Sequence, residues 1–83
     1  MNKIDIIHKY YVLRSGLNSL SALMGKKIPL EGLTAEQDAD EQAVAEKNTY
    51  YRMTDPEDID YDAEWVFINR LETKYSVLPD VTS

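Results

Sequence analysis

Four acidic residues at alternating positions come closest to forming a chemical site in this sequence. They are Asp58, Asp60, Asp62 and Glu64. Their type and spacing match the front half of a calcium loop, in which carboxylate oxygens surround the ion. Such a loop needs glycine at its sixth position and a bidentate glutamate at its twelfth, but these positions hold Ala63 and Asn69. The sequence therefore predicts no metal site, and we expect no cofactor.

Residues that could act as nucleophiles or bases are scarce. His8 is the only histidine and the chain has no cysteine, so it lacks the ligand set of a zinc site. Neither Ser15 nor Ser19 has a base partner in a recognised arrangement. The three glycines are scattered and form no phosphate-binding loop. We therefore expect that the protein is not an enzyme.

The charge is distributed very unevenly along the chain. Residues 1–27 carry five basic residues and one acidic residue, a net charge of +4. Residues 28–68 carry twelve acidic residues and two basic ones, a net charge of −10. The whole chain has a net charge of −6 and a pI near 4.6, which argues against direct binding to nucleic acid because phosphates would repel it.

The acidic block has two interpretations, which the sequence leaves open. In the first, its carboxylates form a recognition surface for a basic partner, because acids three or four residues apart on a helix lie about 5–6 Å from each other, close to the step between phosphates. In the second, the acids only complement helix dipoles, since each predicted helix has acids first and bases last. The first interpretation predicts partner-binding residues at Asp55, Glu57, Asp58, Asp60, Asp62, Glu64, Glu36 and Asp40.

The spacing of apolar residues predicts a long first helix over residues 4–24. Steps of four and three residues connect Ile6, Tyr10, Leu13, Leu17, Leu20 and Met24. This heptad seam should be buried. Because an 83-residue chain without disulfides has little core of its own, we also expect the seam to contribute to self-association as a homodimer. Gly25 should end the helix, and Pro29 should prevent its continuation.

Two further helices are predicted after this one. Thr34 with Gln37 forms a capping-box pattern, and an alanine-rich helix should run from there to about Asn48, or as far as Tyr51. The dipeptide Asp55-Pro56 should begin the third helix.

In the third helix we expect Trp65 and Phe67 to be well buried. A minority alternative is a short strand near residues 58–68, where acidic and apolar residues alternate. We thus predict an all-α bundle of about three helices, with one domain over residues 1–78 and a flexible tail over residues 79–83.

Composition and pattern together predict a small acidic protein-interaction module. We expect an inhibitor or regulator that carries carboxylates in place of DNA phosphates and binds the basic surface of a nucleic-acid-handling protein. Small, acidic, cysteine-free proteins of phage origin are similar in composition. The alternative is a structural subunit that forms a homo-oligomer through its first helix. No segment reaches the roughly 18–20 apolar residues that span a membrane, so we expect a soluble, cytoplasmic protein with no membrane partner.

Overall fold

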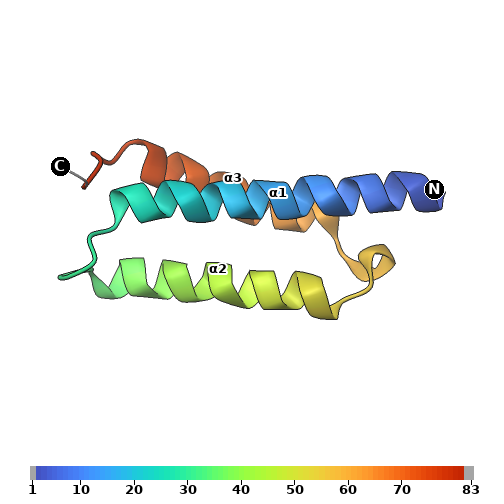
Figure 1. Cartoon of the computed structure of the whole chain (residues 1–83), viewed down its shortest axis with the longest axis horizontal. Helices are drawn as coiled ribbons and strands as arrows, with labels where there is room; N and C mark the ends of the chain where they lie inside the picture. Colours follow the sequence, from blue (N-terminus) through green and yellow to red (C-terminus); the bar gives the residue numbers. More distant parts are fainter. Residues whose placement is uncertain (1, 82–83) are drawn as a thin grey trace.

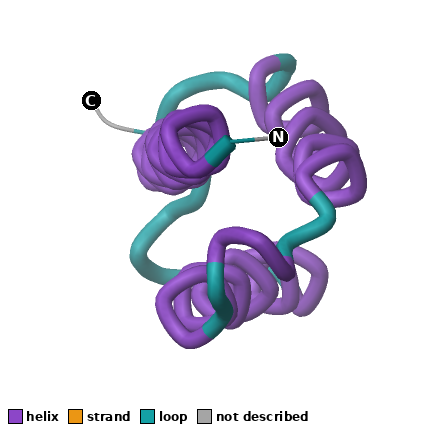
Figure 2. The backbone as a smooth tube through the Cα atoms, turned by 90° about the vertical axis from the view of Figure 1, so that its right-hand side faces the viewer, coloured by secondary structure: helices purple, strands orange, loops and turns teal. Residues whose placement is uncertain are grey.

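Three α-helices and one short 3₁₀ helix make up the computed structural model, which describes residues 2–81. The helices are α1 (Lys3–Lys27), α2 (Ala35–Met53), η1 (Pro56–Asp58) and α3 (Tyr61–Ser76). α2 runs antiparallel to both α1 and α3 (Figure 1), and an end-on view places the three α-helices at the corners of a triangle (Figure 2). The all-α prediction is confirmed. Residues 2–81 contain no strand, so the alternative strand near residues 58–68 is wrong.

The first helix is longer than its apolar pattern predicts. Its start is capped by Asn2, whose side-chain oxygen accepts a hydrogen bond from the Asp5 amide at 2.9 Å. The prediction that Gly25 ends the helix is wrong, because helical conformation continues to Lys27. Ile28 is the residue that leaves the helix, with φ −102° and ψ 123°. It precedes Pro29, and the proline ring disfavours helical conformation in the residue before it.

The capping box predicted for the second helix is confirmed. The Thr34 hydroxyl accepts a hydrogen bond from the Gln37 amide, and the Gln37 side chain accepts one from the Thr34 amide, both at 3.0 Å. The helix runs beyond the predicted end to Met53. Only two of its side chains are buried, Val44 and Tyr51, so α2 brings little apolar surface to the core.

The third helix does not begin where the sequence predicts. Pro56 occupies the first position of a helix, but that helix is η1, which has only three residues. The chain then becomes extended at Ile59, whose side chain is buried. Asp60 caps α3 by accepting a hydrogen bond from the Ala63 amide at 3.2 Å. Burial of Ile59 thus separates two turns that the sequence pattern joins into one helix.

The heptad seam of α1 lies in the core of the bundle, as predicted. Leu13, Leu17, Leu20 and Met24 are buried, while Ile6 and Tyr10 are half-buried near the helix start. The core face of α3 opposes this seam with Ile68, Leu71 and Tyr75. Each fully buried side chain of this size contributes about 1.5–3 kcal/mol.

Trp65 and Phe67 are half-buried, so the prediction that they are well buried is wrong. The core face of α3 follows Ile68, Leu71 and Tyr75, which leaves Trp65 and Phe67 on the two flanks of that face. Trp65 packs against α1 at Gly16, where an added Cβ would lie 2.4 Å from the indole ring. Phe67 lies toward α2, with the Lys47 ammonium 5.2 Å from its ring centre. Gly16 is therefore required for the close approach of α1 and α3.

The segment after α3 makes contacts with the end of α1. The Lys27 ammonium lies 2.6 Å from the Asp80 carboxylate and donates a hydrogen bond to the Leu78 carbonyl at 2.6 Å. The Val81 amide donates to the Lys26 carbonyl at 2.8 Å. These contacts fall within the predicted tail over residues 79–83, of which residues 82–83 lie outside the described part of the chain. The domain boundary at residue 78 stays a prediction.

Gly16 and Gly25 offer a matched test of this packing. Gly25→Ala should stabilise the protein by about 1 kcal/mol, because alanine favours the helix and nothing lies within 4 Å of its Cβ position. Gly16→Ala should be about 1–3 kcal/mol less stable than Gly25→Ala, because it must displace Trp65. Urea unfolding of both variants measures the difference.

The same pair in a Trp65→Ala background provides the control. Without the indole ring, Gly16→Ala should become stabilising and match Gly25→Ala. Equal stabilities of the two alanine variants in the wild-type background would contradict the close approach.

Candidate protein-interaction surface

A buried carboxylate joins α2 to α3. Glu64 is only 6% exposed and accepts a hydrogen bond from the Tyr51 hydroxyl at 2.9 Å. The Lys47 ammonium lies 3.0 Å from the same carboxylate. Lys47 and Tyr51 are one turn apart on α2, so both reach the same point on α3. We call these three residues the Glu64 cluster.

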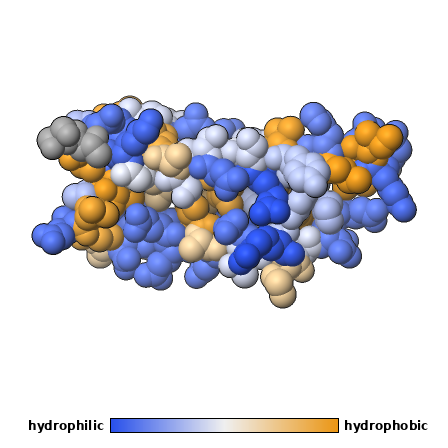
Figure 3. All heavy atoms as spheres, viewed as in Figure 1, coloured by the Kyte–Doolittle hydropathy of each residue, from blue (hydrophilic) through white to orange (hydrophobic). Residues whose placement is uncertain are grey.

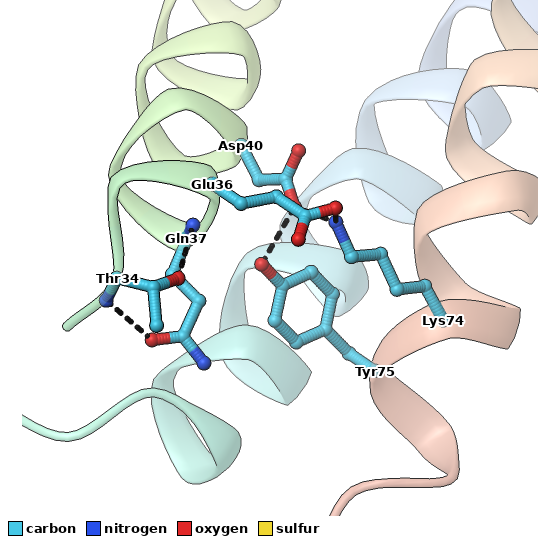
Figure 4. Close-up of polar contacts among 6 residues, drawn as sticks. All are labelled: Thr34, Glu36, Gln37, Asp40, Lys74 and Tyr75. Atoms are coloured by element: carbon cyan, nitrogen blue, oxygen red, sulfur yellow. Dashed lines mark hydrogen bonds and ion pairs between the residues drawn. The ribbon is translucent and has the colours of Figure 1, made fainter.

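A second group of polar residues joins the same two helices at their other ends (Figure 4). The Asp40 carboxylate accepts hydrogen bonds from the Lys74 ammonium at 2.6 Å and from the Tyr75 hydroxyl at 2.7 Å. Lys74 also lies 2.6 Å from Glu36, one turn before Asp40. We call these four residues the Asp40 cluster.

The two clusters have the same chemistry with the helices exchanged. In the Glu64 cluster, α3 supplies the acid and α2 supplies the lysine and the tyrosine. In the Asp40 cluster, α2 supplies the acid and α3 supplies the lysine and the tyrosine. Among the non-exposed residues that the structure describes, no buried side-chain nitrogen or oxygen lacks a hydrogen-bond partner. Glu64 can therefore be buried, and Asp40 half-buried, without the penalty of an unpaired polar group.

The clusters change the acidity of their members. Burial alone would raise the pKa of Asp40, but the hydrogen bonds from Lys74 and Tyr75 outweigh it and lower this pKa below its ordinary value. Burial, and then the hydrogen bond to Asp40, raises the pKa of Tyr75 to about 12. Burial, and then the hydrogen bond to Glu64, also raises the pKa of Tyr51. The hydrogen bonds to Asp40 and Glu36 raise the pKa of Lys74.

Three of the acids predicted to bind a partner are therefore engaged inside the chain. Glu64 is buried, so it does not belong to an open acidic surface. Asp40 is half-buried beneath Lys74 and Tyr75. Glu36 is exposed, but it is paired with Lys74. The structure uses these three carboxylates to hold α2 and α3 together.

The other five predicted acids gather at one end of the bundle. Asp55, Glu57 and Asp58 belong to η1 and its N-terminal flank, and Asp60 and Asp62 begin α3. All five are exposed. Among residues 2–81, no ion pair within 4.0 Å involves any of them. We call these five residues the acidic corner.

The acidic corner does not have the spacing that the sequence suggests. The predicted neighbours Asp58 and Asp62 do not share a helix, because Ile59 and Asp60 interrupt it. Asp60 and Glu64 do not form an exposed pair either, since Asp60 caps α3 and Glu64 is buried. The carboxylates therefore lie on a short loop and a helix start, rather than along one regular helix face.

The predicted self-association seam is covered by the rest of the chain. Leu13, Leu17, Leu20 and Met24 pack on residues of α2 and α3 in the core. A second copy could reach Leu13 and Leu20 only if the bundle opened, whereas Leu17 and Met24 line a groove between α1 and α2. Ile6 and Tyr10 are half-buried, and the Tyr10 hydroxyl donates a hydrogen bond to the Tyr51 carbonyl at 2.9 Å.

The partners of Glu64 and Asp40 were not identified from the sequence. One signal for Glu64 is visible, because it stands four residues before Ile68 on the same stripe as Leu71 and Tyr75. An acid on a core stripe must be paired. Nothing in the local sequence specifies Lys47 and Tyr51 as its partners, since they lie on another helix.

Comparison of the chain with known protein families, curated proteins and solved structures finds no significant match. Within residues 2–81, no three histidine, cysteine or acidic side chains are grouped so that they could hold a metal ion. None of the helices described combines the length and the apolar character that a membrane crossing requires.

The lowered pKa of Asp40 predicts a loss of stability in acid. Because this pKa is lower in the folded than in the unfolded chain, ionised Asp40 stabilises the fold above its unfolded pKa, and this contribution disappears as the pH falls through the folded pKa. Between about pH 5 and about pH 2, the free energy of unfolding of Asp40→Asn should therefore fall less steeply than that of the wild type. Asp38→Asn, at an exposed acid of the same helix, serves as the control for loss of one carboxylate from α2. Identical slopes for all three proteins would contradict this assignment.

Tyr51 and its neighbour Tyr50 test the Glu64 cluster. Tyr51→Phe should destabilise the protein by about 1.5–3 kcal/mol, because it removes a hydrogen bond to a buried carboxylate. Tyr50→Phe, at an exposed ring, should change stability by less than about 0.5 kcal/mol. Denaturant unfolding compares the two, and equal effects would show that the Tyr51 hydroxyl contributes nothing.

Proposed function

We propose that this protein is a non-enzymatic interaction module whose acidic corner binds a basic surface on a nucleic-acid-handling protein. In this role the corner competes with nucleic acid for the basic surface, so the module acts as an inhibitor or regulator. The observation that carries the proposal is the concentration of five exposed carboxylates at one end of the bundle, without ion-pair partners among the described residues.

Complementation of helix dipoles accounts for only part of the corner. Asp60 and Asp62 lie at the start of α3, where a negative charge stabilises a helix by about 0.3–1 kcal/mol. Asp55, Glu57 and Asp58 belong to η1, which has three residues and no side-chain cap hydrogen bond. So short a helix has little dipole to complement. These three carboxylates therefore support a role outside the fold.

Electrostatic complementarity mainly accelerates the encounter of two proteins and selects the partner. The corner is suited to this because its charges are exposed and lie close together at one end of the bundle. The rest of the acidic surface is less concentrated, since Asp38, Glu41 and Glu46 are spread along α2. The proposed partner should therefore recognise the corner rather than the net charge of −6.

Two quadruple variants with the same change in net charge test the proposal. The corner variant carries Asp55→Asn, Glu57→Gln, Asp58→Asn and Asp62→Asn, and it keeps Asp60 as the cap of α3. The control variant carries Asp38→Asn, Glu41→Gln, Glu46→Gln and Glu72→Gln, all at exposed acids away from the corner. A nuclease-treated host lysate supplies the partner by affinity capture on the wild-type protein, and stopped-flow mixing then measures association rates.

The corner variant should bind that partner at least about tenfold more slowly at low salt, and its rate should depend less on salt. The control variant should stay within about threefold of the wild type. Poly-lysine serves as a reference for attraction by net charge alone and should respond equally to both variants. Unchanged association of the folded corner variant across a salt series, or capture of no basic protein at all, would overturn the proposal.

A further inference from the structure

The face of α1 that points away from the core is largely uncovered by the rest of the described chain. Only its edges lie beside other elements, Ile7 beside η1 and Val12 beside the start of α3. Large apolar side chains are exposed on its N-terminal half: Ile4 at 77%, Ile7 at 50%, Tyr11 at 65% and Val12 at 43%. Hydrophobic side chains gather at this end of the molecule in Figure 3. α2 ends beside Tyr10, so neither α2 nor α3 covers the first two turns of α1 from outside.

This outer face carries no charged side chain along most of the helix. A second heptad pattern runs along it through Ile4, His8, Tyr11, Ser15, Asn18 and Ala22, all of them exposed. None of these six is an acid, a lysine or an arginine. The exposed residues of α2, in contrast, include Glu36, Asp38, Glu41, Glu46 and Arg52. In a chain with 29% charged residues, an uncharged helix face is typical of a surface that another molecule covers.

A groove of about 460 Å³ lies beside the C-terminal half of the same face, between α1 and α2. Buried Leu17, Met24 and Val44 form its apolar floor. Small residues line its sides, among them Ser21 and Gly25, and no atom lies within 4 Å of the position that a Gly25 Cβ would take. The groove therefore has room for an apolar side chain from outside.

We propose that a second copy of this chain docks on the outer face of α1, with the two α1 helices antiparallel. In this arrangement the large residues of one helix meet the small residues of the other. With the two-fold axis near Leu13, Ile4 lies opposite Ala22 and Tyr11 opposite Ser15 of the second copy. Ile7 lies level with Asn18 and Ser21, which line the groove. Ile7 of each copy then inserts into the groove between α1 and α2 of the other. The contact is isologous, so it closes as a dimer.

Electrostatics favour this occupant over a surface on α2. The antiparallel arrangement places the positive end of each helix dipole beside the negative end of the other. Lys3 lines the same hollow as Ile7, together with Asp55 and Glu57 of the acidic corner. Of these charged side chains, Lys3 is the one that attracts Glu41 on the rim of the second copy's groove. Two chains of net charge −6 repel each other. Contact through the outer face of α1 keeps the exposed acidic sides of the two α2 helices away from each other.

The size of the face sets the strength of the dimer. From Ile4 to Ala22 it is about 27 Å long and about 10 Å wide, which is small beside a stable protein interface. A contact of this size is expected to be weak, with a dissociation constant of about 1–100 μM. The dimer should therefore depend on concentration, and it should become stronger at high salt, where repulsion between the chains is screened.

Sedimentation of the full chain over a concentration series tests the dimer directly. Ile7→Glu should raise the dissociation constant at least about tenfold, because it brings a charge into the groove. Gly25→Leu should do the same by filling the groove, while it favours the helix. Val66→Glu adds the same charge as Ile7→Glu at a side chain of α3 that is 69% exposed, and it should leave the dimer unchanged. Circular dichroism verifies that each variant is folded.

Two results of this series would overturn the proposal. One is a wild-type chain that stays monomeric up to about 500 μM, well above the expected dissociation constant. This result would overturn the dimer even if the same face binds another protein. The other is a dimer that survives both Ile7→Glu and Gly25→Leu. The outcome is separate from that of the acidic corner, because salt should strengthen the dimer and weaken corner binding.

Disulfide trapping tests the antiparallel register, since the chain has no native cysteine. A mixture of Ile4→Cys and Ala22→Cys chains should form a mixed disulfide under mild oxidation. Each variant alone should form far less disulfide dimer. A dominant disulfide in the Ile4→Cys chain alone would show parallel helices and overturn the proposed arrangement.

Discussion

The attachment of α2 to α3 depends on polar pairs in which each helix supplies the acid for one cluster and the lysine and tyrosine for the other. α2 buries only Val44 and Tyr51, so apolar contact alone does not determine how it slides or rotates on α3. A carboxylate that accepts from a lysine and a tyrosine on the facing helix has a single satisfied arrangement. Two such clusters at opposite ends of one antiparallel pair fix both the register and the rotation of α2. Removing the hydrogen bond from Tyr51 to the buried Glu64 carboxylate costs about 1.5–3 kcal/mol, which is a large share of the stability of a small domain.

This use of carboxylates divides the acids of the chain into two groups. Glu64, Asp40 and Glu36 are paired with lysines inside the chain, whereas the acids of the corner are exposed and have no such pair among the described residues. The division follows from position rather than residue type, because the corner lies where η1 turns between α2 and α3 and no lysine of the facing helices reaches it within 4.0 Å. The same constraint that holds α2 in place therefore leaves a concentrated negative charge at one end of the bundle.

Most of the fold could be predicted from local sequence, since the heptad seam of α1 and the capping box at Thr34 act within a few residues of each other. The errors arose where distant contacts decided the outcome. Gly25 stayed helical because Pro29, rather than the glycine, determines where α1 ends. The break before α3 depends on the burial of Ile59. The half-burial of Trp65 depends on its packing against Gly16 of α1. In the candidate site, five of the acids named from the sequence are exposed in the structure, and their role in binding a partner stays a prediction. The pairing of Glu64 with Lys47 and Tyr51 could not be predicted, because these residues lie on different helices and come together only when α2 packs beside α3.

The corner is also the least favourable arrangement of charge in the molecule. Five carboxylates within eight residues repel one another, and none of them has an ion-pair partner among the described residues. The dipole of α3 stabilises Asp60 and Asp62 at its start, which offsets part of the repulsion. The three-residue η1 gives no comparable stabilisation to Asp55, Glu57 and Asp58. A chain of 83 residues has only a small net stability, and the Glu64 and Asp40 clusters show that carboxylates are paired where they join α2 to α3. Unpaired charges that destabilise a small fold are typical of residues retained for function. Among the acids of the corner, fold stability gives the weakest reason for the three on η1 and its flank.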